Sequence, residues 1–211
     1  MQKPVIAAFD FDGTLSRGVS GLRFFRQLLG PWGYLRFWAR HLPSLALFGL
    51  RMGDEGRMEL ITRAVFAGRR ADDIRREAQI FLERTLPRHL IAFAMDRLRS
   101  HVREGHRCVI VSRGYEAYLR PWAIGLGIRD VIATRLEEDA GGRLTGHLAE
   151  ASCDGREKCS RLLAIVGDRA GCELYAYGDG RGDHAMMAEA DRAFICGRSG
   201  FEPWRGGRRR P

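Results

Sequence analysis

The chain has 211 residues, of which 45% are hydrophobic and 29% are charged, so it can bury the core of one domain carrying an insertion. This composition excludes disordered, collagen-like, disulfide-rich and polytopic membrane proteins. The formal net charge of +9 favours an anionic partner or substrate.

Short apolar runs alternate with helical patterns along the chain. The runs have no helical period and are followed by polar residues, as buried parallel strands do. Strands are expected at residues 5–9, 108–111, 131–134, 174–177 and 193–196. Helices are expected at residues 74–82, 90–102, 115–126 and 156–166. This alternation predicts an α/β fold, a Rossmann-like doubly wound parallel sheet with helices on both faces.

The chain is expected to divide into three parts. Residues 16–85 have helical patterns throughout, which predicts an all-helical cap inserted after the first strand. Residues 1–15 and 86–200 would form the α/β core, and residues 201–211 a basic tail rich in glycine and arginine.

The positive charge is uneven and is almost entirely arginine. The chain contains 33 arginines and only two lysines, Lys3 and Lys158. Between Asp12 and Asp54 there is no acidic residue. Six arginines lie in that interval: Arg17, Arg23, Arg26, Arg36, Arg40 and Arg51. The surplus charge therefore belongs to the insertion and to the C-terminal end.

Reactive polar groups follow three of the expected strands, at the edge where open α/β sheets bind ligands. They are Asp10-Phe-Asp12-Gly-Thr, Ser112-Arg113-Gly114 and the run from Gly178 to Asp183, with Lys158 at the start of a helix. A carboxylate nucleophile can form an aspartyl-phosphate, and a second one two residues on can protonate the leaving oxygen. Later carboxylates can hold Mg²⁺, while a hydroxyl, a lysine and loop N–H groups can bind phosphoryl oxygens.

These motifs, in this order over about 175 residues, resemble those of the haloacid dehalogenase (HAD) superfamily of phosphatases. The resemblance implies that Asp10 is the nucleophile and Asp12 the general acid and base, and that Asp12 also ligates the metal through its carbonyl. Ser112 and Lys158, with Arg113 and Gly114, would bind the phosphoryl group. The implied metal ligands are Asp10, Asp12, Asp179 and Asp183, and Asp183 would also orient a metal water or Lys158. The insertion resembles the helical cap of the phosphoserine-phosphatase-like branch.

Each of these residues also has a purely structural interpretation. Asp10 and Asp12 would suit an Asx turn, Ser112 the end of a strand, and Asp183 the start of a helix. Lys158 would suit a solvated first turn. It is, however, one of only two lysines in a chain dominated by arginine, which favours a site that needs a compact ammonium.

The insertion bears on the substrate. In phosphoserine phosphatases, whose cap this insertion resembles, an acidic residue soon after the first motif holds the substrate amine. Residues 16–21 offer no carboxylate, so the comparison with that family disfavours phosphoserine. Aromatic residues are dense in the insertion: Phe24, Phe25, Trp32, Tyr34, Phe37, Trp38 and Phe48. They would either pack the core of the cap or, with the arginines, form an interfacial helix on an anionic membrane. The apolar run at residues 42–50 is too short to span a bilayer, which takes about 20 residues.

The chain as a whole resembles the HAD hydrolases grouped around bacterial phosphatidylglycerophosphatase. The leading hypothesis is therefore an Mg²⁺-dependent phosphomonoesterase, acting on a phospholipid head group at the inner membrane surface. The alternatives are a phosphatase of small soluble metabolites and a nucleic-acid-binding protein. The latter is disfavoured because the chain has no zinc-finger, ribonucleoprotein or helix-turn-helix signature. Five cysteines without a CxxC pair, and carboxylates too early for a signal peptide, predict a cytoplasmic protein.

Overall fold

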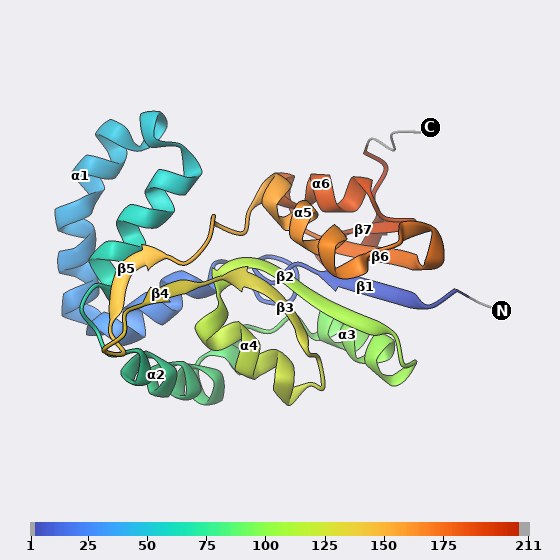
Figure 1. The fold of residues 1–211 in the computed structure, drawn as a ribbon, viewed down its shortest axis with the longest axis horizontal. Helices are drawn as coiled ribbons and strands as arrows, with labels where there is room; N and C mark the ends of the chain where they lie inside the picture. Colours follow the sequence, from blue (N-terminus) through green and yellow to red (C-terminus); the bar gives the residue numbers. More distant parts are fainter. Residues whose placement is uncertain (1–2, 207–211) are drawn as a thin grey trace.

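A six-stranded sheet in the order β3-β2-β1-β6-β7-β8 forms the centre of the molecule (Figure 1). The computed structural model describes residues 3–206, apart from the side chains of residues 43–55. Five strands are parallel: β1 (Val5–Phe9), β2 (Arg107–Tyr115), β3 (Asp130–Thr134), β6 (Glu173–Gly178) and β7 (Arg192–Cys196). β8 (Phe201–Pro203) is antiparallel to β7. The predicted α/β fold with a doubly wound parallel sheet is confirmed.

The position of β1 explains why its sequence is apolar without alternation. It lies between β2 and β6, and Ala7, Ala8 and Phe9 are completely buried. Ala7 and Phe9 pack in one core cluster and Ala8 in a second cluster on the opposite face. A strand covered on both faces needs apolar side chains at every position.

Helices cover the two faces of the sheet. α3 (Ala92–Arg103) and α4 (Glu116–Gly125) lie on one face, and α5 (Gly155–Val166) and α6 (His184–Ala188) on the other (Figure 1). Three short 3₁₀ helices complete the connections: Leu86–His89, Arg169–Gly171 and Arg181–Asp183.

The segment expected to be a helical insertion consists of α1 (Ser20–Phe66) and α2 (Ala71–Arg84). Gly30 adopts a φ of +67° ahead of Pro31, where a residue with a side chain would resist both the dihedral and the following ring. α1 reverses its direction along its length (Figure 1). This brings the ring of Phe25, near its start, to 5.8 Å from that of Phe66 at its end.

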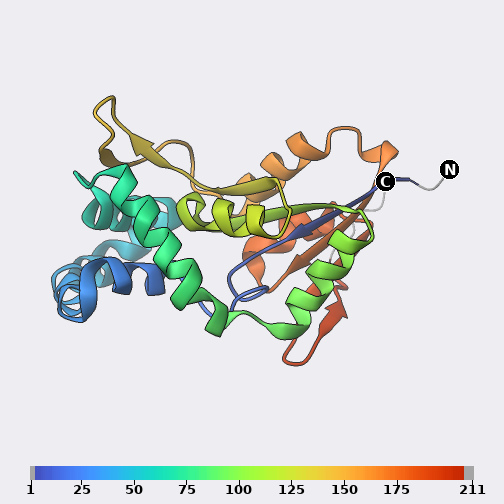
Figure 2. The same cartoon turned by 90° about the horizontal axis from the view of Figure 1, so that it is seen from below.

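A hairpin that the sequence did not predict lies against the end of α1 (Figure 2). Its strands are β4 (Leu136–Glu138) and β5 (Leu144–Leu148). The amide of Gly68 donates a hydrogen bond to the carbonyl of Leu144, at 2.8 Å. A Cβ on Gly146 would lie 2.8 Å from that of Ala67, so this glycine permits the close approach. The helical insertion is therefore supported by a hairpin from the second half of the chain.

Two expected boundaries need correction. The segment from residue 201 is not entirely a tail, because β8 extends the sheet to Pro203. β2 does not end at Ser112 but continues to Tyr115. The side chains of Phe48 and Arg51, and the last arginines, Arg208 to Arg210, lie outside the described part of the structure. Over the described part of the chain, no helix has the length and hydropathy of a membrane span.

Candidate active site

The first motif forms a tight loop at the carboxyl end of β1. The amide of Asp10 donates to the carbonyl of Tyr177 in β6, at 2.9 Å, which fixes the start of the loop. The amides of Leu15 and Ser16 both donate to the carbonyl of Phe11, each at 2.8 Å. Within the loop, Gly13 has a φ of +86°, and a Cβ there would lie 1.9 Å from Oδ2 of Asp179. Only glycine lets the first and last motifs approach this closely.

Asp10 is the most tightly held carboxylate of this loop, and only 3% of it is exposed. Its Oδ1 accepts a hydrogen bond from Nζ of Lys158 at 2.5 Å, and its Oδ2 accepts one from the hydroxyl of Thr14 at 3.0 Å. Nζ of Lys158 also donates to Oδ1 of Asp183 at 2.7 Å. Lys158 thus joins motifs that are far apart in the sequence.

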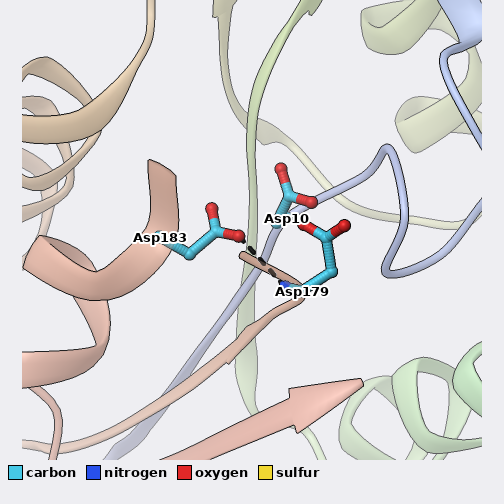
Figure 3. A group of neighbouring side chains, drawn as sticks. All are labelled: Asp10, Asp179 and Asp183. Carbon is cyan, nitrogen blue, oxygen red and sulfur yellow. Dashed lines mark hydrogen bonds between the residues drawn. The ribbon is translucent and has the colours of Figure 1, made fainter. Parts of the chain in front are cut away.

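The last motif turns back on itself after β6. Oδ2 of Asp183 accepts hydrogen bonds from the amides of Asp179, at 3.0 Å, and Gly180, at 3.3 Å. Figure 3 shows the carboxyl group of Asp179 directed toward Asp10, with Asp183 beside them. A Cβ on Gly178 would lie 2.5 Å from Cβ of Asp183, so this turn also depends on a missing side chain.

Asp12 faces the insertion rather than the other carboxylates. Its Oδ1 accepts a hydrogen bond at 2.9 Å from the amide of Ser20, the first residue of α1. The hydroxyl of Ser20 shares a hydrogen bond with Tyr118 of α4 at 2.8 Å. The side chain of Asp12 is not part of the carboxylate cluster, and its expected contact with a metal through the carbonyl stays a prediction.

Ser112, Arg113 and Gly114 lie on an irregular stretch of β2. Val111 pairs with Ile132 and Tyr115 with Thr134, so β2 has two more residues than β3 over this interval. Such bulges re-aim side chains at the edge of a sheet.

The bulge is held by side chains. The buried hydroxyl of Ser112 accepts a hydrogen bond from the amide of Gly114 at 3.0 Å. Nη1 of Arg113 pairs at 2.9 Å with Asp154, which also accepts from the amide of Gly155 at the start of α5. Arg113 is therefore tied to the helix that carries Lys158.

One cavity of about 820 Å³ brings all the predicted site residues together. Its charged and polar lining includes Asp10, Asp12, Ser112, Arg113, Gly114, Lys158, Asp179 and Asp183. The roles assigned to them remain predictions, but their convergence disfavours the structural interpretations given above.

Sequence reasoning missed other residues of the cavity. Arg181 lines the cavity, whereas Thr14 is buried behind it and donates to Asp10. Both belong to the quoted motifs, and their positions there are the only signal of a role. The opposite wall is apolar and comes mostly from α1: Val19, Leu22, Phe25, Met58 and Ile61. These wall residues form no recognisable motif. Apolar contact with a substrate requires only that they share one face of the helix, which is the same spacing that packing in a core produces.

Burial dominates the electrostatics of the site. It raises the pKa of Asp10, and the carboxylates of Asp183 and Asp12 raise it further, whereas the Lys158 ammonium opposes the rise. Burial also raises the pKa of Asp12 and of Asp179, and Asp183 adds to the shift of Asp179. Burial disfavours the Lys158 ammonium, but Asp10 and Asp183 outweigh it and raise its pKa. The site holds more negative charge than Lys158 balances.

The carboxylate cluster suits a divalent cation. Oxygens of Asp10, Asp179 and Asp183 lie within 4.8 Å of one another, and Asp179 is exposed to the cavity. Hard oxygen ligands of this kind suit Mg²⁺. A cation would offset the charge repulsion that, in addition to burial, raises the pKa of Asp10 and of Asp179. The residues present therefore fit the predicted metal.

Comparison with known proteins agrees with this geometry. The protein CicA of Caulobacter vibrioides (strain NA1000 / CB15N) is 33% identical over 195 residues, covering 90% of this chain and 84% of that protein. A Bordetella pertussis Tohama I protein of unknown function has a similar structure, with a TM-score of 0.78 at 23% identity. The match covers 91% of this chain and 89% of that one.

A phosphoserine phosphatase, described as a phospho-aspartyl intermediate analogue, also shares the fold. Its TM-score is 0.60 at 19% identity, over 92% of this chain and 86% of that one. The family model for haloacid dehalogenase-like hydrolases matches residues 7–188, an interval that spans every motif of the cavity. The chain belongs to the haloacid dehalogenase-like hydrolase family, as its motifs predicted.

Proposed function

We propose that this hydrolase is an Mg²⁺-dependent phosphomonoesterase that forms an aspartyl-phosphate on Asp10. The observation that carries the proposal is the position of Asp10, buried at the floor of the cavity between Lys158 and Thr14. One structure of a phosphoserine phosphatase with this fold is described as an analogue of the phospho-aspartyl intermediate, and this supports the same chemistry here.

The first half of the reaction transfers the phosphoryl group to Asp10. A carboxylate oxygen of Asp10 forms a bond to phosphorus while the bond from phosphorus to the ester oxygen breaks. Asp12, whose pKa is raised by burial, donates its proton to that departing oxygen. Lys158 and the hydroxyl of Ser112 offer hydrogen bonds to the phosphoryl oxygens, whose charge they help to stabilise.

The second half restores Asp10. A water molecule attacks phosphorus, Asp12 now accepts its proton, and the bond from phosphorus to Asp10 breaks to release inorganic phosphate. Asp10, Asp179 and Asp183 would hold the metal ion. When bound, Mg²⁺ supplies positive charge that lets two anions, the carboxylate and the phosphate, approach each other.

We further propose that the substrate is a phospholipid head-group phosphate, such as that of phosphatidylglycerophosphate. The apolar residues line the same cavity as the expected phosphate site, which suits a substrate with apolar groups close to its phosphate. Arg181 lines the same cavity and suits a second anionic group. Asp154, a further carboxylate of the lining, is already paired with Arg113, which leaves a substrate amine without a free partner there.

The chemistry can be tested on the purified protein with a generic phosphomonoester, with Mg²⁺ and with a chelator. We expect turnover that needs the metal, together with a phosphorylated peptide containing Asp10 after rapid acid quench and mass spectrometry. Turnover without phosphorylation of that peptide, or full turnover in the chelator, would contradict the proposal.

The substrate needs a separate panel. Phosphatidylglycerophosphate in mixed micelles would be compared with glycerol 3-phosphate, which lacks the acyl chains, and with phosphoserine. We expect a higher kcat/KM for the lipid. Equal or faster cleavage of the soluble phosphates would favour the small-metabolite phosphatase and leave the chemistry at Asp10 unaffected.

A further inference from the structure

An apolar stripe is exposed on the outside of α1. Trp32 is 78% exposed, Leu35 59% and Leu42 56%, and Ala39 is exposed between them. At 3.6 residues per turn, these four positions fall within one sector of about 80° of the helix. Six large hydrophobic side chains are exposed in the described part of the chain, and three of them, those of Trp32, Leu35 and Leu42, belong to this stripe.

The other aromatic residues of this helix do not share that exposure. Phe24, Phe25 and Phe37 are buried, and Tyr34 and Trp38 are partly buried against the core. The core of the cap thus uses five of the seven aromatic residues named above for the insertion. The side chain of Phe48 lies outside the described ones. The stripe is therefore not needed to pack the cap, and an exposed apolar face of this kind indicates an interaction surface.

The charge beside the stripe is positive. Arg36 and Arg40 are exposed and lie at about 40° and 80° from Trp32 around the helix. No acidic residue occurs from residue 13 to residue 53 to oppose them. A second copy of the chain docked about a two-fold axis would bring these arginines toward one another, which costs energy. An anionic surface is complementary to them.

We propose that this stripe, consisting of Trp32, Leu35, Ala39 and Leu42 with Arg36 and Arg40, docks on an anionic lipid bilayer. The helix lies along the surface, with the tryptophan and leucines at the boundary between head groups and acyl chains. The two arginines contact lipid phosphates, whose negative charge attracts them. The inference goes beyond the proposed function and does not depend on the chemistry at Asp10.

The position of α1 makes this docking accessible. Figure 1 shows the helix at one end of the molecule, projecting away from the sheet. The same helix supplies Leu22 and Phe25 to the wall of the cavity. A bilayer bound along the stripe would therefore contact the element that lines the active site without covering the sheet.

Vesicle flotation of the whole protein tests the proposal. We expect recovery with vesicles containing phosphatidylglycerol and little with pure phosphatidylcholine. Recovery should fall between about 0.1 M and 1 M salt, because the Debye length shrinks from about 10 Å to about 3 Å. Equal recovery with both lipids, or none with either, would overturn the proposal.

Variants locate the surface. Trp32→Ser with Leu35→Ser, and separately Arg36→Gln with Arg40→Gln, should each reduce binding to anionic vesicles by about tenfold or more. Ile124→Ser is the matched control, because Ile124 is 58% exposed on α4, far from the stripe in sequence, and should bind normally. A blue shift of tryptophan emission on binding should disappear in Trp32→Phe. Unchanged binding in the stripe variants would show that the surface lies elsewhere.

Two further measurements distinguish lipid binding from self-association and from loss of phosphatase activity. Sedimentation velocity should show the same mass for the wild type and Trp32→Ser. A dimer that dissociates in this variant would show that the stripe binds a second copy instead. Hydrolysis of a soluble phosphomonoester should be equal in all variants, so loss of vesicle binding and loss of phosphatase activity are distinguishable outcomes.

Discussion

Hydrogen bonds hold the floor of the cavity together, whereas apolar side chains form its wall. On the floor, Asp10, Lys158 and Asp183 hold one another through hydrogen bonds of 2.5 and 2.7 Å. On the wall, Leu22, Met58 and Ile61 present apolar surface. Directional bonds fail when an atom moves by an ångström, whereas apolar burial depends mainly on area. We therefore expect substitutions on the floor to abolish chemistry, and those on the wall to change which substrate is used.

The largest effect is expected at Asp10. Asp10→Asn keeps the size of the side chain but removes the nucleophilic oxygen charge, and should reduce kcat by more than about 10⁴-fold. Asp96→Asn, which removes an exposed carboxylate on α3, is the control and should be active. Residual turnover within tenfold of the wild type would remove Asp10 from the nucleophile role.

The loss of rate on replacing Asp12 should depend on how much the leaving oxygen needs a proton. Asp12→Asn can still accept the hydrogen bond from Ser20, but it cannot protonate the ester oxygen. We expect a loss of about 10²–10⁴-fold with an alkyl phosphate, and a smaller loss in the phosphorylation step with a nitrophenyl phosphate, whose leaving oxygen needs no proton. The rate constant of the nitrophenolate burst measures this step. An equal loss with both substrates would contradict the general-acid role.

Lys158→Arg tests whether the floor needs geometry as well as charge. Nζ donates to two carboxylates in a space where Lys158 is 4% exposed, and a planar guanidinium is too large for that position. We expect a loss of about 10²–10³-fold, the usual effect of removing one oxyanion donor. Thermal unfolding would be recorded alongside kcat. Wild-type activity in a stably folded variant would show that the charge alone suffices.

The wall should give smaller and substrate-dependent changes. Met58→Ala removes apolar surface from the cavity and should raise KM for a lipid phosphate by about tenfold. With glycerol 3-phosphate, KM should change little. A comparable change of KM for both substrates would place Met58 in general support of the cavity instead of in recognition of an apolar group.

One buried histidine, His101 on α3, should make the stability of the protein depend on pH. His101 contacts Tyr177 through Nε2 at 2.9 Å and His106 through Nδ1 at 2.8 Å. Burial, with a contribution from His106, lowers the pKa of His101 to about 4. The unfolded state, with a pKa near 6.5, binds the proton first, so the free energy of unfolding should fall as pH drops from about 6.5 to about 4.

The size of this effect is on the order of 2–3 kcal/mol. Urea unfolding at pH 7 and at pH 4.5, for the wild type and for His101→Gln, measures it. The variant should lose less stability over that interval. Parallel pH profiles would assign the acid sensitivity to other groups.

The contrast between floor and wall also explains which features the sequence could predict. The buried strands were recognisable because a strand covered on both faces is apolar at each position, as in β1. The candidate catalytic residues Asp10 and Asp12 were recognisable because they are carboxylates two residues apart that directly follow this strand. Both features impose local constraints that short stretches of sequence record.

What the sequence could not predict depends on contacts between distant segments. The hairpin of β4 and β5 has strands of only three and five residues, and it is held by packing against the end of α1. The bulge in β2 arises where the strand meets β3 and carries Ser112 away from a regular register. Trp32 and Trp38 look alike in the sequence, and only the folded helix shows that one is exposed and the other packed.

Gly13 offers a way to silence the enzyme by shape alone. Gly13→Ala would keep every charged residue of the site in the sequence. The added methyl would nevertheless need the space that Oδ2 of Asp179 occupies, at a backbone dihedral that alanine resists. The loop and the last motif would have to separate. Such a protein keeps the surface charge and the outer face of α1 unchanged, so it separates attachment to lipid from turnover in living cells.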